Sequence, residues 1–269
     1  AATADLDDAN ISDPFHLEAY GKVAVNYNRD VETFPVLKAM MERILGASPY
    51  QSPTDMGVNM AGLAICDDEA VCDAARMEIV RRYFSACVNT KRTGCGADQI
   101  SKLKMLMKQA GVTPDLSPIR AAALAKEEST GKPAGALMLP NGEVISGRTS
   151  TRLGAASSLL LNALKYLAGI PEETYIISNE AIDPICHLKT ELLHSKNPRL
   201  HPDEMLIALS LSSATEPLAA RAIEAAEQLR GCDAFFSVII SSADEKLYRT
   251  LGINVSCEAK YERSSYYHK

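Results

Sequence analysis

The sequence predicts a mixed α/β (α+β) protein, with a mainly helical domain over residues 1–112 followed by a three-layer α/β domain over residues 113–269. Two observations predict this class. Apolar residues recur at helical spacing through the first third, whereas segments with helical and strand-like patterns alternate in the remainder. With 269 residues, of which 46% are hydrophobic, the chain is long enough to bury a core in each domain.

Three helices account for the first domain, and we expect them at residues 31–45, 67–88 and 97–110. In the last of these, the apolar residues share one helical face. Gly111, followed by Pro114, is a typical stop signal for that helix.

An Asn-Gly turn marks the second domain. Pro140-Asn141-Gly142 joins two apolar segments, 134–139 and 143–147, and this turn is a strong signal for a β-hairpin. Ser117 and Pro118 predict the start of a helix over 119–128, and a further helix is expected over 153–167. Beyond it we expect strands at 174–178, 205–211, 235–240 and 253–257, separated by helices at 182–193, 216–229 and 244–251.

Composition and missing motifs exclude several functions. The net charge of −6 argues against nucleic-acid binding, and no apolar run approaches the roughly 20 residues that span a bilayer. Seven scattered cysteines indicate a reducing, cytoplasmic setting. No GxxxxGK[ST], GxGxxG, GxSxG or HExxH motif occurs, so the sequence lacks the usual phosphate loop, dinucleotide, hydrolase and zinc-protease signatures.

The order helix, hairpin, helix, strand over residues 117–178 resembles the cytidine-deaminase-like topology. In that topology, a zinc-binding His or Cys followed by Ala-Glu opens the helix after the hairpin. Here that helix opens with Arg152-Leu153-Gly154, and the Pro-Cys-x-x-Cys partner is reduced to Cys186 and His187. The resemblance therefore implies a deaminase-like sheet that lacks the zinc ligands.

Polar chemistry is densest between residues 186 and 204, which hold three of the five histidines. His201 is the candidate acid–base residue. The candidate ligands for a phosphate or carboxylate are His194, Lys196, Asn197 and Arg199, with Lys189 beside them. The alternative is a solvated loop that caps the next element. A metal site in this stretch is not favoured, because the spacing of its Cys and His residues fits no standard pattern.

Three further polar clusters are candidate sites. Asp5, Asp7 and Asp8 could hold Mg²⁺ beside a phosphate, although acidic runs are more often solvated. The other two clusters, around Asn28 and Arg29 and around Asp55, lie in loops. Loops often carry functional residues, but Asn and Asp in loops also form ordinary turns. On the functional interpretation, we expect anion binding at Asn28 and Arg29 and a catalytic carboxylate at Asp55.

Several blocks of sequence carry a resemblance to a known family. They are Ala2-Thr3-Ala4-Asp5-Leu6-Asp7-Asp8, Asp13-Pro14-Phe15-His16, Val25-Asn26-Tyr27-Asn28-Arg29-Asp30, Ser52-Pro53-Thr54-Asp55-Met56-Gly57-Val58-Asn59 and Asn197-Pro198-Arg199-Leu200-His201. With these blocks, the chain resembles the C-terminal half of the bacterial family catalogued as domain of unknown function 1846. The resemblance implies a missing N-terminal half with a glycine-rich, Lys-containing segment suited to a nucleotide phosphate.

Two functions remain open on this basis. In the first, the chain is part of a cytosolic nucleotide- or phosphometabolite-dependent enzyme, with Mg²⁺ and the nucleotide bound mainly by the missing half and an anionic substrate bound by the polar loop. In the second, it is a non-catalytic scaffold that binds other copies of itself or a partner. The expected partners are its own N-terminal half, further copies in a homo-oligomer, and a small anion, but neither a nucleic acid nor a membrane.

Overall fold

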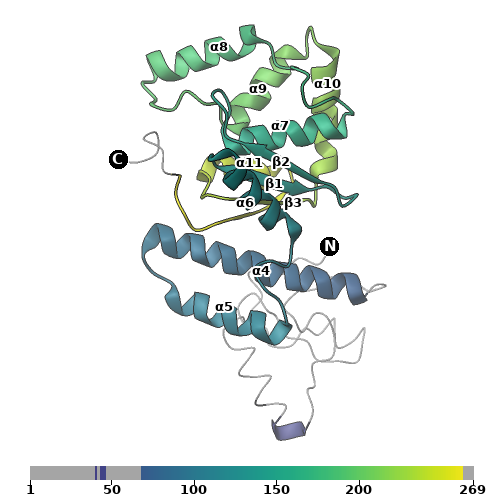
Figure 1. Ribbon diagram of the computed structural model, residues 1–269, viewed down its shortest axis with the longest axis vertical. Coiled ribbons are helices and arrows are strands. Elements are labelled where there is room, and N and C mark those ends of the chain that lie inside the picture. Colours follow the sequence, from purple (N-terminus) through teal and green to yellow (C-terminus); the bar gives the residue numbers. More distant parts are fainter. Residues whose placement is uncertain (1–39, 41–42, 47–67, 263–269) are drawn as a thin grey trace. The chain divides into compact units, whose positions relative to one another are not determined.

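Figure 1 shows the computed structural model, which describes residues 40, 43–46 and 68–262. Contacts within the chain divide it into two units, Ala1–Leu116 and Ser117–Lys269. The helix expected over 31–45 lies mostly outside the described residues, although residues 40 and 43–45 are helical. Among the described residues, no helix is both long and apolar enough to cross a membrane.

The described part of the first unit is a pair of helices, α4 (Asp68–Thr93) and α5 (Ala97–Ala110), which pack against each other. Ile79 and Leu103 are among the side chains they bury. Gly111 ends α5 in the left-handed conformation, with φ of 67°, and its N–H donates to the carbonyl of Lys108. Both predicted helices and the predicted stop are therefore confirmed.

The second unit is built on a four-stranded mixed sheet in the order β2-β1-β3-β4. Strand β1 (Ala134–Met138) runs antiparallel to β2 (Val144–Arg148) and to β3 (Asp233–Phe236), and β3 runs parallel to β4 (Asn254–Cys257). The Asn-Gly hairpin is confirmed: Gly142 has φ of 84°, and its N–H donates to the Leu139 carbonyl at 2.9 Å.

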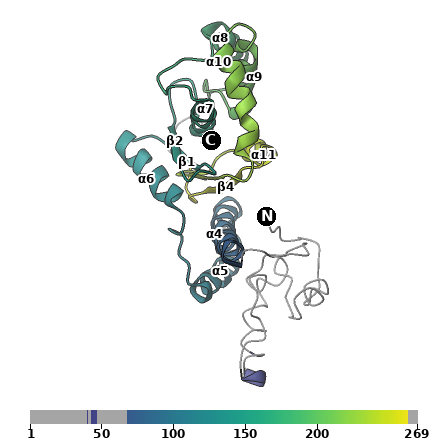
Figure 2. The same cartoon turned by 90° about the vertical axis from the view of Figure 1, so that its right-hand side faces the viewer.

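Helices cover both faces of this sheet (Figures 1 and 2). Helices α6 (Pro118–Thr130) and α7 (Ala155–Leu167) both pack along β1 and β2 but scarcely contact each other, so they lie on opposite faces. Glycines let α7 approach closely, because a Cβ at Gly147 would lie 2.4 Å from the backbone nitrogen of Leu159. A Cβ at Gly135 would lie 2.6 Å from the Phe236 ring.

Further helices extend the layer that α7 begins. They are α8 (Asn179–His187), the π-helical turn η2 (Leu188–Leu192), α9 (Pro202–Ser212), α10 (Pro217–Glu224), the 3₁₀ turn η3 (Ala225–Leu229) and α11 (Ser242–Thr250). Among them, α9 and α10 pack on α7, and α8 packs on α9.

Two predicted strands are wrong. The strand expected at 205–211 is helix α9, in which Met205, Ala208 and Leu209 are buried at helical spacing behind Pro202 in the first turn. No strand forms at 174–178. Because α7 is followed by helices before β3, the predicted helix–hairpin–helix–strand order is absent, and the structure leaves the cytidine-deaminase-like topology unconfirmed.

The predicted cap at Ser117 is only half right. Ser117 occupies the N-cap position of α6, yet its side chain makes no capping hydrogen bond, and its buried Oγ has no hydrogen-bond partner among the described residues. The start of α6 therefore relies on Pro118, whose φ suits a first helical turn.

The close approach of α7 predicts a marked effect for Gly147→Ala. The added methyl would overlap the α7 backbone, so we expect the free energy of unfolding to fall by about 1–3 kcal/mol or more in urea denaturation. Gly154→Ala is the control, because the nearest atom to its new Cβ would be 3.8 Å away. Equal stability of the two variants would contradict the account of helix–sheet packing.

Candidate functional site

The backbone of Leu200 ties the polar stretch to the start of α7. Leu200 N–H donates to the Arg152 carbonyl at 2.8 Å, and Leu153 and Leu200 form an isolated parallel bridge. The Leu200 carbonyl accepts from Ser157 Oγ at 2.7 Å, inside the protein. His201, the next residue and the N-cap of α9, is thereby held at a defined place beside α7.

Helix α11 is anchored to the same part of α7 by Tyr248. This side chain is fully buried, and its hydroxyl donates to the Ala156 carbonyl at 2.7 Å. Its ring meets that of Phe236 edge to face, with centroids 5.4 Å apart. Asp244 precedes Tyr248 by four residues and shares its helix face, so the anchor also orients Asp244. Ser241 caps this turn by accepting from Asp244 N–H at 3.0 Å.

His201 and Asp244 form the central contact of the site. His201 Nδ1 lies 2.9 Å from Asp244 Oδ1, and because a carboxylate only accepts, Nδ1 carries the proton. The hydrogen bond to Asp244 raises the pKa of His201, against the opposing effect of burial. The side chain of His201 is 27% exposed. A raised pKa and a partly exposed ring suit proton donation.

Lys189 and Glu204 stabilise the backbone around His201. Lys189 is 7% exposed, and its Nζ donates to Glu204 Oε2 and to the Arg199 carbonyl, each at 2.6 Å. The same Glu204 oxygen accepts from His201 N–H at 2.7 Å, as in a helix capping box. Lys189, expected to receive an anion, is instead engaged within the protein, where leaving either charge unpaired would be costly.

The predicted anion ligands of this loop differ in availability. Asn197 is 6% exposed, and its Oδ1 accepts from Arg199 N–H at 3.1 Å. Arg199 itself donates to Glu262 at 3.0 Å. His194 adopts a left-handed backbone, with φ of 52°, just after η2. His194 and Lys196 are exposed, so of the four predicted ligands these two face solvent.

Other predicted site residues lie outside the described part of the chain. This applies to Asp5, Asp7, Asp8, Asn28, Arg29 and Asp55, whose roles stay predictions. Within the described part, no three His, Cys, Asp or Glu side chains are grouped as metal ligands would be. Cys186 Sγ contacts the Pro198 carbonyl at 3.6 Å, and burial raises the pKa of this thiol, which disfavours the thiolate that metals require.

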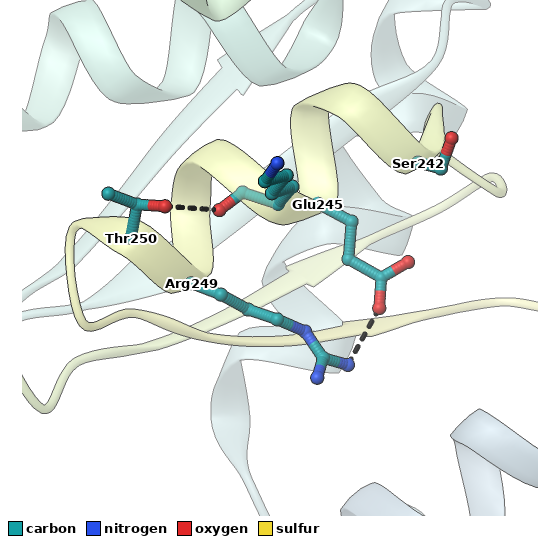
Figure 3. Close-up of a pocket in the computed structure, with 5 residues that line it drawn as sticks. Ser242, Glu245, Arg249 and Thr250 are labelled. Atoms are coloured by element: carbon teal, nitrogen blue, oxygen red, sulfur yellow. Dashed lines mark hydrogen bonds and ion pairs between the residues drawn. The ribbon is translucent and has the colours of Figure 1, made fainter.

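A surface hollow of about 410 Å³ lies along the outer side of α11 (Figure 3). The lining residues that the structure describes all come from this one helix, and the side chains of Glu245 and Arg249 pair at 2.7 Å. Thr250 Oγ1 bonds back to the Lys246 carbonyl at 2.9 Å. These described polar groups bind one another instead of converging on the hollow, so we do not assign it a function.

A second hollow, of about 420 Å³, lies beside the end of α6 and includes Glu262, the partner of Arg199. Its other lining carboxylate, Glu127, pairs with Lys260 at 2.6 Å. Both lining carboxylates are thus paired with cations, as expected for groups that hold chain segments together.

Asp244 is the residue that sequence reasoning missed. The pattern Ser241-x-x-Asp244 indicates a helix start, with an acidic residue in the first turn, and gives no sign of a histidine partner. His201 and Asp244 are 43 residues apart in the chain. The packing of α11 against α9, with Tyr248 tying α11 to α7, brings them together.

The pair predicts how His201 titrates. We expect Asp244→Asn to lower the pKa of His201, because the main cause that raises it is removed while burial, which lowers it, remains. NMR titration of the His201 ring signals measures this. Glu245→Gln, one residue further along α11, is the control, and an unchanged His201 titration in Asp244→Asn would disprove the assignment.

The same shift sets a pH window for stability. The pKa of His201 in the folded protein lies above its unfolded value of about 6.5. The contribution of protonated His201 to the free energy of unfolding is therefore fully present below pH ~6.5 and is lost as pH rises through the folded pKa. Urea denaturation across this pH range should show that the free energy of unfolding falls in the wild type, and that it falls less in Asp244→Asn. Parallel pH profiles would contradict this.

Comparison with known proteins identifies the family. Residues 115–267 match the domain of unknown function DUF1846, C-terminal, and residues 1–111 match its N-terminal counterpart. The chain is 52% identical over all 269 residues to a UPF0371 protein of Corynebacterium efficiens, covering 54% of that relative. The identity to UPF0371 proteins of Corynebacterium glutamicum and Streptococcus thermophilus is 51% and 49% respectively, with 54% of each relative covered.

The chain thus spans about half the length of the curated relatives it matches. The expectation that it resembles the C-terminal half alone is inaccurate, because its first 111 residues match the N-terminal domain of the family. That match and the C-terminal match together cover almost the whole sequence. The chain belongs to the DUF1846 family, whose bacterial members include the UPF0371 proteins.

Proposed function

We propose that this chain forms part of a cytosolic nucleotide- or phosphometabolite-dependent enzyme, in which His201 is the acid–base residue for an anionic substrate. The observation that carries the proposal is the 2.9 Å contact between His201 and Asp244. A carboxylate behind an imidazole sets the tautomer and favours the imidazolium, which donates from Nε2 to a phosphate or to a leaving oxygen.

The surroundings of His201 support this role. Helix α9 begins at Pro202, directly after His201, and the dipole of a helix favours negative charge at its N-terminal end. Lys196, exposed on the preceding loop, adds a cation that no described residue pairs with. Arg199 is less suited to the task, because its guanidinium already binds Glu262.

The predicted nucleotide, Mg²⁺ and cytosolic setting are also part of this proposal. A nucleotide and Mg²⁺ would be held mainly by family residues outside this chain, with Asp5, Asp7 and Asp8 close to the metal and Asn28, Arg29 and Asp55 completing the site. A cytosolic setting is supported by the free thiols of Cys87, Cys95, Cys186, Cys232 and Cys257.

A non-catalytic scaffold that binds its own copies or a partner is the second candidate. It is favoured by the internal engagement of the polar loop, in which the charged groups of Lys189 and Arg199 are both bound by carboxylates of the same chain. On this proposal, the loop is a structural connection between α8 and α9, and the His201–Asp244 pair joins α9 to α11.

Anion binding distinguishes the two candidates. We expect sulfate, which keeps its charge between pH 6 and pH 8.5, to stabilise the chain more strongly at pH 6, where the imidazolium is present. A ligand at 100 times its Kd adds about 2.7 kcal/mol to the free energy of unfolding. Adding ADP at constant pH tests whether the chain binds a nucleotide. Thermal unfolding with and without each ligand is the measurement.

The matched variants are His201→Gln and His187→Gln. Both remove a histidine from the same stretch, but His187 is exposed and lies at the end of α8. We expect only His201→Gln to lose the pH-dependent stabilisation by sulfate. If the two variants respond as the wild type does, His201 is not an anion ligand and the scaffold becomes the better account.

A further inference from the structure

A third cavity, beside the C-terminal end of α7, is lined by a buried lysine. Its volume is about 220 Å³, and it lies at the edge of strand β2 between residues of α6 and α7. The lining residues are Lys126, Val144, Ile145, Ser146, Asn162, Lys165, Tyr166, Ile170 and Glu172. The volume is below the roughly 300–1,000 Å³ of pockets for drug-sized ligands, so an occupant would be small.

Lys165 is the unusual member of this lining. It is only 6% exposed, and its Nζ donates to the backbone carbonyl of Glu172 and to no carboxylate oxygen. Burial lowers the pKa of Lys165, against the opposing charges of Glu172 and Glu173. A buried ammonium is costly unless it is paired, and a carbonyl is a neutral partner. Among the described residues, Lys165 thus hydrogen-bonds to no carboxylate, although the charges of Glu172 and Glu173 act on it.

The edge of β2 adds donors to the same cavity. Backbone hydrogen bonds join Glu143 to Leu139 and Thr149 to Pro133, so antiparallel alternation turns the backbone of Ser146 away from β1. The Ser146 carbonyl is already bound by Asn162 Nδ2 at 3.0 Å, which confirms this direction. The Ser146 N–H therefore faces the same edge and remains available to an acceptor.

Charge and shape together select a class of ligand. The lining contains two lysines and one glutamate, and neither Lys126 nor Glu172 has an ion-pair partner among the described residues. Ile145, which shares the α7 face of β2 with Gly147, and Ile170 add apolar surface to the same lining. A ligand with one negatively charged acceptor group and a short apolar chain matches both the cationic and the apolar lining.

We propose that this cavity binds a small aliphatic monocarboxylate, with its carboxylate on Lys165 and the Ser146 N–H and its chain against Ile145 and Ile170. The site is separate from His201, since none of its lining residues belongs to the polar stretch. The ligand is one that neither candidate function requires of the second unit. Its carboxylate gives the buried ammonium of Lys165 a hydrogen-bonded counter-charge.

Pentanoate and pentanamide test this directly. The two have nearly the same shape, but only pentanoate carries a charge. In methyl NMR of the 269-residue chain, we expect pentanoate to shift the signals of Ile145 and Ile170 at concentrations at least tenfold below those at which pentanamide acts. Ile79 of α4 is the internal reference and should not move. Equal responses to both compounds, or no response of the cavity methyls to either, would overturn the proposal.

Lys165→Met removes the charge while keeping most of the side-chain length, and Lys246→Met does the same at an exposed position on α11. We expect at least a tenfold loss of pentanoate affinity in the first variant only. If Lys165→Met fails to fold, the pentanoate–pentanamide comparison in the wild type still decides. Loss of the response in His201→Gln would instead place the carboxylate at the other site and refute this one.

Discussion

The close contact between α7 and the β1–β2 hairpin is the constraint on which the second unit depends. Gly147 leaves no side chain between strand and helix, so the α7 backbone lies directly on β2, while Gly135 makes room for the Phe236 ring and the Leu159 side chain. Interiors are densely packed, and a helix held this closely has little freedom to shift. Segments of the chain that pack on α7 are therefore also held in fixed positions relative to the strands.

Both candidate sites use α7 in this way, at opposite ends. Near its start, Ser157 and the Ala156 carbonyl hold Leu200 and Tyr248, and so bring His201 against Asp244. Near its end, Asn162 and Lys165 reach the edge of β2. One rigid helix thus supports an acid–base pair and a cationic cavity without direct contact between them.

The two cationic groups differ in how burial is offset. At His201, a carboxylate accepts from the ring, and the hydrogen bond outweighs desolvation, so the pKa rises. At Lys165, the bonded partner is a neutral carbonyl, so desolvation is the largest effect and the pKa falls. The first arrangement stabilises a proton donor, whereas the second leaves a charge for a ligand to neutralise.

The sequence by itself determined the mixed α/β class, most helices and the hairpin, because periodicity, stop signals and Asn141-Gly142 act over a few residues. It also singled out His201. Only the tertiary structure decided that 205–211 is a helix, since a short apolar segment fits either period until its burial is known. It likewise decided the partners of His201, Lys189 and Arg199, because Asp244, Glu204 and Glu262 respectively reach them through packing that no local pattern encodes.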